Sequence, residues 1–389
     1  MNKDHNINAG RQSFLRRDLS SLLTRGGFMN KKTDFGDNLW QYRSMRMKKR
    51  GLLLAFLLIT VILTVTDLCT GASGMTPVEL VRALFGGGAA EQRMIVWRIR
   101  MPRVLAALGA GCGLALSGCV MQNVLRNPMA SPSTLGVSNA AVLGANVAII
   151  LFGAGSFHST HGSELTLQKP GLVTACAFLF ALGATALVLL LSGRHRFSAE
   201  TVVLAGVALG ALCSAGTTVL QYMAMDTQVA AAVFWTFGDL GRASFKESLL
   251  LIGVSGVCFV YFFVRGRAYD AMGCGEESAR SLGVPTGRVR CFTLLLASLL
   301  CAVCVSFLGI IGFVGLIAPQ LARRMTGAGH RYLLPATALT GASLLLFSDT
   351  LSRLLPFRMT LPVGAVTSLF GAPVFLLLLL RGRKEGVRR

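Results

Sequence analysis

The sequence predicts an all-α polytopic membrane protein with about ten transmembrane helices, and three observations support this fold class. The 389-residue chain is 53% hydrophobic and only 14% charged, whereas about 25% of the residues in a soluble domain are charged. Apolar runs of about 20 residues, the length needed to cross a bilayer as a helix, recur along it. Basic residues gather in alternate connections between these runs, as is typical of cytoplasmic loops.

Ten apolar segments are expected to be the membrane-spanning helices. Eight are long, continuous apolar runs, at residues 104–124, 134–155, 171–192, 201–223, 247–264, 291–311, 333–348 and 362–380. Two are less regular, because 51–66 is short before Asp67 and 312–322 contains Pro319 and Gln320. Each is expected to be helical, since a helix satisfies its own backbone hydrogen bonds in lipid. The transmembrane domain is therefore predicted to cover residues 47–383.

Basic residues between the predicted helices indicate how the chain is oriented. With ten helices and a cytoplasmic N-terminus, every segment expected in the cytoplasm carries Lys or Arg: 45–50, 126–128, 193–196, 265–290, 322–331 and the C-terminal tail. Both termini are thus expected in the cytoplasm, in a multi-pass protein of the cytoplasmic (inner) membrane. The net charge of +21 follows mainly from this topology, and we expect no nucleic acid partner.

The two ends of the chain are expected to lie outside the transmembrane domain. Residues 1–46 are polar and mixed in charge, which predicts a disordered, basic cytoplasmic extension, and residues 384–389 form a basic cytoplasmic tail. No small-residue cleavage site directly follows "MKKRGLLLAFLLITVILTV", so we interpret this run as an uncleaved first helix and not as a secretory signal. Met1, Met29, Met45 and Met47 are all candidate start residues.

Several kinds of chemistry have no sequence support. The centres of the predicted helices lack Asp, Glu, His, Lys and Arg, which ion-coupled transporters use as relays. No phosphate-binding G-x-x-x-x-G-K-[ST] motif is present, so any ATP would be used by another chain, and we expect this chain to bind no cofactor. Most of the ten cysteines lie in apolar runs, including Cys301 and Cys304, which favours packing over redox or metal chemistry. We expect neither a metal site nor catalytic residues.

Arginines near two of the predicted helices break the rule that basic residues stay inside. Arg98, Arg100 and Arg103 precede the second predicted helix, and Arg353 precedes the tenth, all on the side expected to be external. One explanation is that they reach phosphates of membrane lipids. The other is that they meet an acidic partner.

The segment 265–290 is the largest expected cytoplasmic connection. Within it, "EESARSL" can form about two turns of helix, and the "GVP" that follows would end that helix. A short helix here would suit docking to a soluble partner, and a plain solvated connector is the alternative.

Several motifs occur together and in order. The stretch "RIRMPRVLAALGAGCGLALSGCVMQNVLRNPMASPSTLGVS" contains R-x-P-R, S-G-x-x-x-Q, N-P-[LM]-A-x-P and L-G-V-S, and "GEESARSLGV", "GFVGLIAPQLARR" and "LPVGAVTSLFGAPVFLLLL" follow later. This series resembles the FecCD family, the permease subunits of ATP-binding-cassette (ABC) importers for iron-siderophore complexes, haem and vitamin B12. The resemblance covers roughly residues 50–383.

The resemblance implies a BtuC-like bundle of ten helices that acts with other chains. It implies a second permease copy, identical or a close paralogue, around a central path. It also implies a cytoplasmic ABC ATPase dimer and an extracytoplasmic substrate-binding protein that docks through acidic residues.

The resemblance also assigns roles to residues of this chain. Docking of the binding protein would use Arg100, Arg103 and Arg353, with Arg98 left to lipid phosphates. The coupling loop to the ATPase would contain Gly275, Glu276, Ala279, Arg280, Leu282 and Gly283. The turn after the second predicted helix would be structural or would line the pathway, through Gln122, Asn127, Pro128 and Pro132.

Two positions depart from the family pattern, and the cargo stays open. Gln320 stands where the family often has histidine, and Asn139 stands where it has glycine. No residue distinguishes siderophore, haem and cobalamin as cargo. The alternatives in other classes are a permease for free metal ions, an ion-coupled secondary transporter and a structural membrane anchor.

Overall fold

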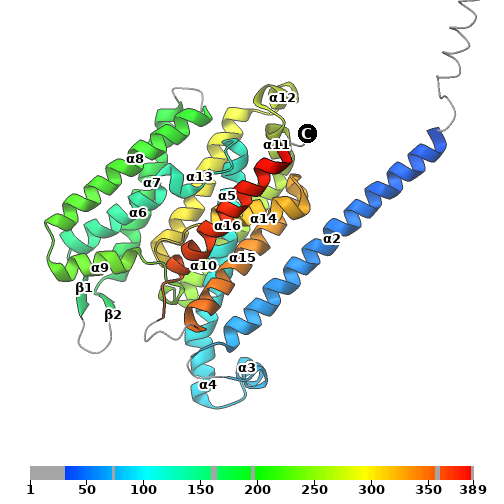
Figure 1. Ribbon diagram of the computed structural model, residues 1–389. Helices are drawn as coiled ribbons and strands as arrows, with labels where there is room; N and C mark the ends of the chain where they lie inside the picture. Colours follow the sequence, from blue (N-terminus) through cyan, green and yellow to red (C-terminus); the bar gives the residue numbers. More distant parts are fainter. Residues whose placement is uncertain (1–30, 72–74, 159–163, 194–197, 355–359, 387–389) are drawn as a thin grey trace, which may run out of the picture. The chain divides into compact units, whose positions relative to one another are not determined.

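The computed structural model describes residues 31–71, 75–158, 164–193, 198–354 and 360–386. Its contacts divide the chain into two units, Met1–Gly51 and Leu52–Arg389. The second unit contains nearly all of the predicted transmembrane domain and is described here by itself. Figure 1 shows it as a bundle of helices.

All ten predicted segments are helical. In chain order they are α2 (Lys31–Cys69), α5 (Met101–Val124), α6 (Val137–Asn146) with η3 (Val147–Leu151), α7 (Pro170–Gly193), α8 (Ala199–Tyr222), α10 (Phe245–Val264), α13 (Thr286–Leu308), α14 (Val314–Thr326), α15 (His330–Leu354) and α16 (Val363–Gly386). Of the helices in the described ranges, seven are long and apolar enough to cross a membrane. The helices α6 and α16 have shorter apolar stretches, and α14 has only 13 residues.

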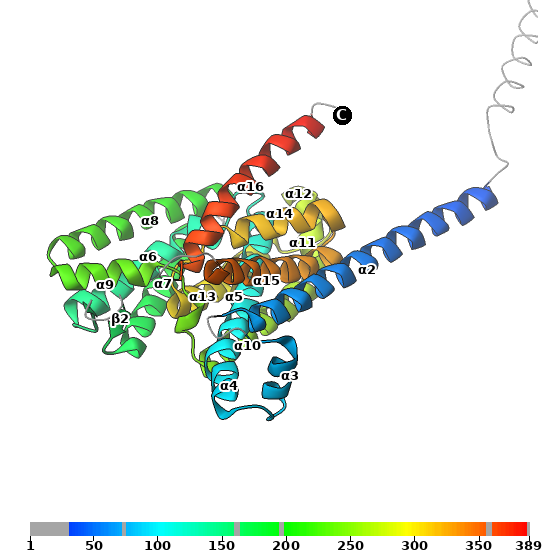
Figure 2. The same cartoon turned by 60° about the horizontal axis from the view of Figure 1, so that its bottom comes forward.

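Helix α5 lies at the centre of this unit and packs against α10, α13, α14 and α15. Small residues allow these helices to approach closely, as is common in membranes. A Cβ atom at Gly118 would overlap the backbone of Gly315 in α14, and one at Gly111 would overlap the backbone of Gly341 in α15. Figures 1 and 2 show α6, α7, α8 and α9 (Asp226–Thr236) grouped together on one side of α5 and α13.

The segment 67–103, predicted to be an external connection, is largely helical. It contains α3 (Pro77–Leu84), α4 (Ala90–Ile95) and η1 (Val96–Arg100), and η1 runs directly into α5. Thr76 caps α3, because its side chain accepts from the Glu79 N–H while the Glu79 carboxylate accepts from the Thr76 N–H. The second spanning helix therefore begins at Ala90, earlier than the apolar pattern predicted.

The predicted all-α membrane fold is confirmed, and a short antiparallel hairpin of β1 (Gly155–His158) and β2 (Glu164–Leu167) is a local addition to it. A further difference from the predictions concerns the N-terminus. Helix α2 begins at Lys31, so residues 31–46, predicted to be disordered, are helical. Once an apolar helix has formed, each preceding residue adds one hydrogen bond without a new nucleation cost. Residues 1–30 and 387–389 of the predicted extension and tail lie outside the described residues.

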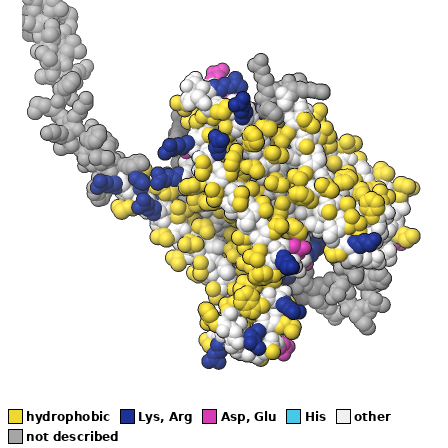
Figure 3. Space-filling model, turned by 180° about the vertical axis from the view of Figure 1, so that it is seen from behind, with side chains coloured by type: hydrophobic (Ala, Val, Ile, Leu, Met, Phe, Trp, Pro, Cys, Tyr) yellow, Lys and Arg dark blue, Asp and Glu magenta, His cyan; other side chains and the backbone are white. Residues whose placement is uncertain are grey.

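The surface of the unit fits a membrane environment. Figure 3 shows hydrophobic side chains over the middle of one face and Lys and Arg toward its two ends. Large apolar side chains are exposed along α8 and α16, among them Leu204, Leu212, Leu369 and Leu376. The cysteines are all free thiols, and Cys301 and Cys304 are buried in α13.

Candidate functional site

Two groups of charged residues lie at opposite ends of α5. The first, which we call the arginine–aspartate cluster, contains Arg100, Arg103 and Arg353 with Asp67, Asp239 and Asp349. The second, around α12 (Glu276–Ser281), contains the residues predicted to couple the chain to an ATPase.

Arg103 joins α5 to α15 within the arginine–aspartate cluster. Its Nε donates to both carboxylate oxygens of Asp349, at 2.8 and 3.0 Å. Its Nη2 lies 3.7 Å from Oδ1 of Asp239, which precedes η4 (Leu240–Arg242). The Arg103 side chain is 14% exposed and that of Asp349 is 0% exposed, so this pair is shielded from solvent.

Arg353 joins α15 to the end of α2. Its guanidinium donates to the Asp67 carboxylate, and its Nη2 lies 2.8 Å from Oδ2 of Asp349 one turn earlier in α15. Its Nη1 also donates to the Thr70 carbonyl oxygen at 2.7 Å, and the Thr350 hydroxyl donates to Asp67 at 2.8 Å. Arg353 is therefore held on several sides, and its side chain is only 10% exposed.

Arg100 caps the same end of α2. Its Nη1 donates to the carbonyl oxygens of Leu68 and Cys69, at 2.6 and 3.0 Å. The last carbonyl groups of a helix have no partner within the helix, so a buried arginine satisfies them. Arg100 is itself buried, which the sequence did not indicate.

The structure thus brings together the three arginines predicted to dock a binding protein, although Arg353 lies about 250 residues from the others. It does not leave them on the surface. Within the cluster Arg103 and Arg353 are paired with carboxylates, and Arg100 donates to helix carbonyl groups, which offsets the cost of burying these charges. Among the residues that the structure describes, Arg82, Arg93 and Arg98 are exposed arginines near this end.

The sequence analysis did not identify Asp67 and Asp349 as partners of these arginines. The available signal was the spacing of Asp349 and Arg353, which puts them one turn apart on the same face of a helix. The partnership of Arg103 with Asp239 and Asp349 had no such signal, because it depends on how distant segments pack.

The predicted short helix in the connection 265–290 is confirmed as α12. It starts after Gly275, which has a φ of 130°, and ends before Gly283, which has a φ of 79°. These positions favour glycine, because both φ angles are positive and glycine has no Cβ atom to clash there. Ala279 is buried, whereas Leu282 is 72% exposed and forms an apolar projection beside charged residues.

Ion pairs fix Glu276 at the start of α12. Its Oε1 accepts from Arg280 at 2.8 Å, and its Oε2 accepts from Arg290 of α13 at 3.1 Å. The hydrogen bond from Arg290, together with the nearby positive charges, holds the pKa of Glu276 below its usual range. Arg290 was not among the predicted site residues.

The turn after α5 is tied to α14. Gln320, one of the departures from the family pattern, donates from Nε2 to Gln122 Oε1 at 3.2 Å and to the Pro128 carbonyl oxygen at 3.3 Å. Asn127 Oδ1 accepts from the Met129 N–H at 2.9 Å, and Pro132 opens the short helix η2 (Pro132–Leu135). These contacts favour the structural interpretation of this turn.

Asn139, the other departure, has a packing role. Its Nδ2 donates to the Gly210 carbonyl oxygen at 3.2 Å, which links α6 to α8.

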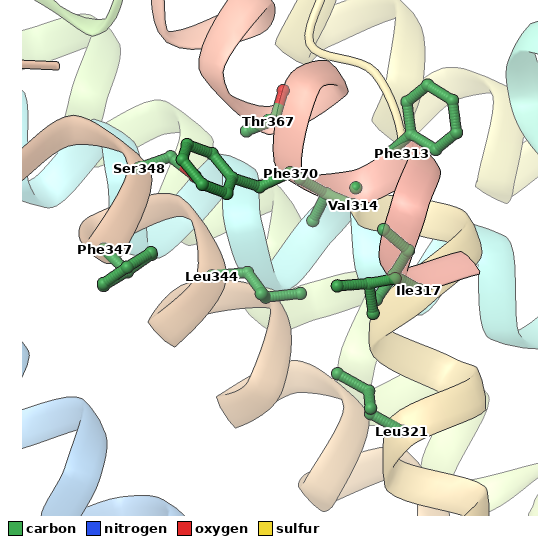
Figure 4. A pocket seen from close by; sticks show the side chains of 11 residues that line it. Phe313, Val314, Ile317, Leu321, Leu344, Phe347, Ser348, Thr367 and Phe370 are labelled. Carbon is green, nitrogen blue, oxygen red and sulfur yellow. The ribbon is translucent and has the colours of Figure 1, made fainter. Parts of the chain in front are cut away.

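An apolar cavity of about 230 Å³ lies between α14, α15 and α16. Figure 4 shows Phe313, Ile317 and Leu321 along one side of it, and Leu344, Phe347 and Phe370 around the rest. The residues that line it include no ionisable side chain. Its lining is mostly apolar, and Ser348 and Thr367 supply hydroxyl groups.

Comparison with known proteins agrees with the motifs and the fold. The sequence matches the FecCD transport family over residues 57–381. The chain belongs to the FecCD transport family. The family predicted from the sequence is therefore confirmed, and the FecCD match covers every helix of the bundle from the middle of α2 to α16.

Individual FecCD relatives align over nearly their whole length. A protein of Methanocaldococcus jannaschii named as an ABC transporter permease is 46% identical over 339 residues, which cover 87% of this chain and 97% of the relative. The hemin transport system permease HmuU of Yersinia pestis is 36% identical, with 86% and 97% covered. The vitamin B12 import system permease BtuC of Salmonella typhi is 36% identical, with 85% and 95% covered.

A solved structure supports the same assignment. An inward-facing ABC transporter described as of the metal-chelate type superposes with a TM-score of 0.72 at 30% identity, and the match covers 85% of this chain and 99% of the other. This FecCD chain is accordingly a multi-span ABC transporter permease, and permeases of this family work with an ATPase and a substrate-binding protein.

Proposed function

We propose that this chain is the membrane-spanning subunit of an importer that carries an iron chelate, either a ferric siderophore or haem, or cobalamin across the cytoplasmic membrane. The observation that carries the proposal is the match to haem and vitamin B12 permeases over nearly the whole of each protein. The chain itself performs no reaction on the cargo, binds no cofactor, and depends on ATP hydrolysis by a separate subunit.

A second permease copy is part of the proposal. The helices α8 and α16 expose large apolar side chains that no other part of the described chain covers, including Leu204, Val207, Leu369 and Leu380. A partner copy packed on these faces would enclose a path between the two subunits. The partner is either a second copy of this chain or a close paralogue, with lipid around the pair.

The coupling to the ATPase would occur at α12. In this proposal a dimeric ATPase contacts the exposed Leu282 and the loop glycines Gly275 and Gly283, while Ala279 anchors the helix to the bundle. Leu282 supports this role, because its exposed apolar side chain would leave water on entering an apolar cleft of a partner. The basic residues of the connection 265–290 and of the other segments predicted to be cytoplasmic favour a cytoplasmic location for both termini.

The binding protein would dock at the opposite end of α5. Arg100, Arg103 and Arg353 belong to this proposal. The contacts that they already make within the chain limit how a binding protein can reach them. An acidic side chain of the binding protein must compete with Asp239 or Asp349 for Arg103. The contact with Asp239 is the weaker one, since it is 3.7 Å long and the Asp239 side chain is 43% exposed.

The proposed cycle uses both ends of the bundle. A loaded binding protein docks near the arginine–aspartate cluster, closure of the ATPase dimer on ATP displaces α12, and the bundle changes from outward to inward access. The cargo then leaves on the cytoplasmic side.

Uptake by proteoliposomes tests this function. The permease is reconstituted with the ATPase and binding protein encoded beside it, and radiolabelled haemin, a ferric hydroxamate siderophore and cyanocobalamin are offered in turn. We expect ATP-dependent uptake of one of the three. Uptake that needs no ATP and collapses with an ionophore would instead identify an ion-coupled transporter, and uptake of free zinc or manganese ions alone would identify a metal-ion permease.

A further inference from the structure

Arg290 connects three helices at the α12 end of the bundle. It lies in the first turns of α13, its Nη2 donates to Glu276 Oε2 of α12 at 3.1 Å, and its Nε donates to the Val124 carbonyl oxygen of α5 at 3.0 Å. The side chain of Arg290 is 2% exposed. We call this arrangement the Glu276–Arg290–Val124 joint.

The joint depends on the shape of the arginine side chain. A guanidinium is a planar fork that can donate in two fixed directions at once, whereas a lysine ammonium is a compact point charge on a flexible stem. The acceptor on α5 is a carbonyl group at the last residue of the helix, which has no partner within the helix. One side chain therefore satisfies a helix end and an acidic residue that belong to different elements.

The other ion pair of Glu276 makes no such connection. Arg280 lies on α12 itself, one turn after Glu276, and its side chain is 58% exposed. This pair stiffens α12, and Arg280 Nε also donates to the Thr286 hydroxyl of α13 at 3.3 Å, so the pair joins α12 to α13 and not to α5. In the part of the chain that the structure describes, Arg290 makes a polar link from α12 to α5.

Helix α5 leads from the joint to the arginine–aspartate cluster. It has 24 residues, which correspond to about 36 Å at a rise of 1.5 Å per residue. Its sides are buried, and close backbone contacts at Gly111 and Gly118 fix it against α15 and α14. A displacement at Val124 is thus passed along a single helix to Arg103, which is bound to Asp349 and Asp239.

We propose that Arg290 is a positioning residue that transmits the movement of α12 to α5 during transport. This inference rests on the proposed function, because it requires an ATPase that displaces α12. It assigns to Arg290 a role distinct from contact with the ATPase, since its side chain is buried beneath α12.

The test measures how many ATP molecules the reconstituted transporter hydrolyses per molecule of cargo taken up. Arg290→Lys keeps the charge and removes the fork, and Glu276→Gln keeps the shape and removes the carboxylate. Arg288→Lys is the matched control, because Arg288 lies in the same helix, is exposed, and is not part of the joint. The assay uses whichever of haemin, siderophore or cyanocobalamin the unaltered transporter takes up.

We expect the ATP consumed per cargo to rise in Arg290→Lys and in Glu276→Gln, because ATP hydrolysis would continue while movement of α12 reaches α5 less completely, and to stay unchanged in Arg288→Lys. If uptake and ATP hydrolysis fall together at a constant ratio, Arg290 merely stabilises the fold and the inference is wrong. Should Arg290→Lys fail to assemble, the ratio in Glu276→Gln decides, since that side chain is partly exposed. Absence of uptake by the unaltered transporter would overturn the proposed function, and the inference with it.

Discussion

Replacing Asp349 tests whether the arginine–aspartate cluster holds the bundle together. Its carboxylate is fully buried and accepts from Arg103 at 2.8 and 3.0 Å and from Arg353 at 2.8 Å. The variant Asp349→Asn keeps the size of the side chain but removes the negative charge. Two buried guanidinium groups then lose their shared partner.

The expected cost follows from the burial of these groups. Removing one member of a buried ion pair typically costs 3–5 kcal/mol, because the remaining charge stays buried without compensation. Arg353 keeps its contacts with Asp67 and the Thr70 carbonyl, and Arg103 keeps the distant Asp239. We therefore expect the lower end of that range, about 3 kcal/mol.

Asp239→Asn is the matched control for this experiment. Asp239 also faces Arg103, but at 3.7 Å and with 43% of its side chain exposed, so its loss should cost about 0–1 kcal/mol. The assay is unfolding of the purified permease by sodium dodecyl sulfate in mixed micelles, followed by circular dichroism. Equal and small changes in the free energy of unfolding for both variants would refute the claim that the cluster is a structural core.

Two further predictions concern packing and pH. Gly118→Ala should destabilise the permease by about 1–3 kcal/mol in the same unfolding assay, because its Cβ would overlap Gly315, whereas Gly253→Ala meets no atom within 4 Å and should not destabilise it. Burial raises the pKa of Asp270, but hydrogen bonds from His330 outweigh it and lower that pKa below the usual value. The pair therefore stabilises the fold above about pH 4, the pKa of an unfolded aspartate, and the stabilisation is lost as the pH falls through the lower folded value. Thermal unfolding between pH 6 and pH 3 should show a larger loss in the unaltered protein than in Asp270→Asn, in which Glu276 still titrates, and an identical pH dependence would contradict it.

Much of the fold and of the family could be predicted from local patterns. A spanning helix requires a long apolar run, so ten segments could be located from composition and length alone. The short helix α12 could also be predicted, because a run of helix-forming residues stands between glycines. The errors arose where a helix continues beyond its apolar part, as in α2 before Met47 and in α4 before α5, since polar residues extend a helix that is already formed.

The candidate sites, too, could be predicted only as far as local patterns reach. The sequence placed Arg100, Arg103 and Arg353 on one side of the membrane and grouped them through the resemblance. It could not show that Asp67 and Asp349 lie between them, because charge compensation depends on how the ends of α2, α5 and α15 meet. It gave no sign of Arg290, whose partners lie 14 residues earlier and 166 residues earlier in the chain.

The sequence by itself thus determined the class of protein, the position of its helices and its family, because hydrophobic length and motif order are local properties of the chain. Only the tertiary structure decided which charged side chains are exposed and which are paired with partners inside the protein. The physical reason is that burying a charge is costly unless a partner is within hydrogen-bonding distance, and that distance is set by the packing of helices remote in sequence. For this permease, packing gives the three arginines internal partners, which a docking protein would have to compete with.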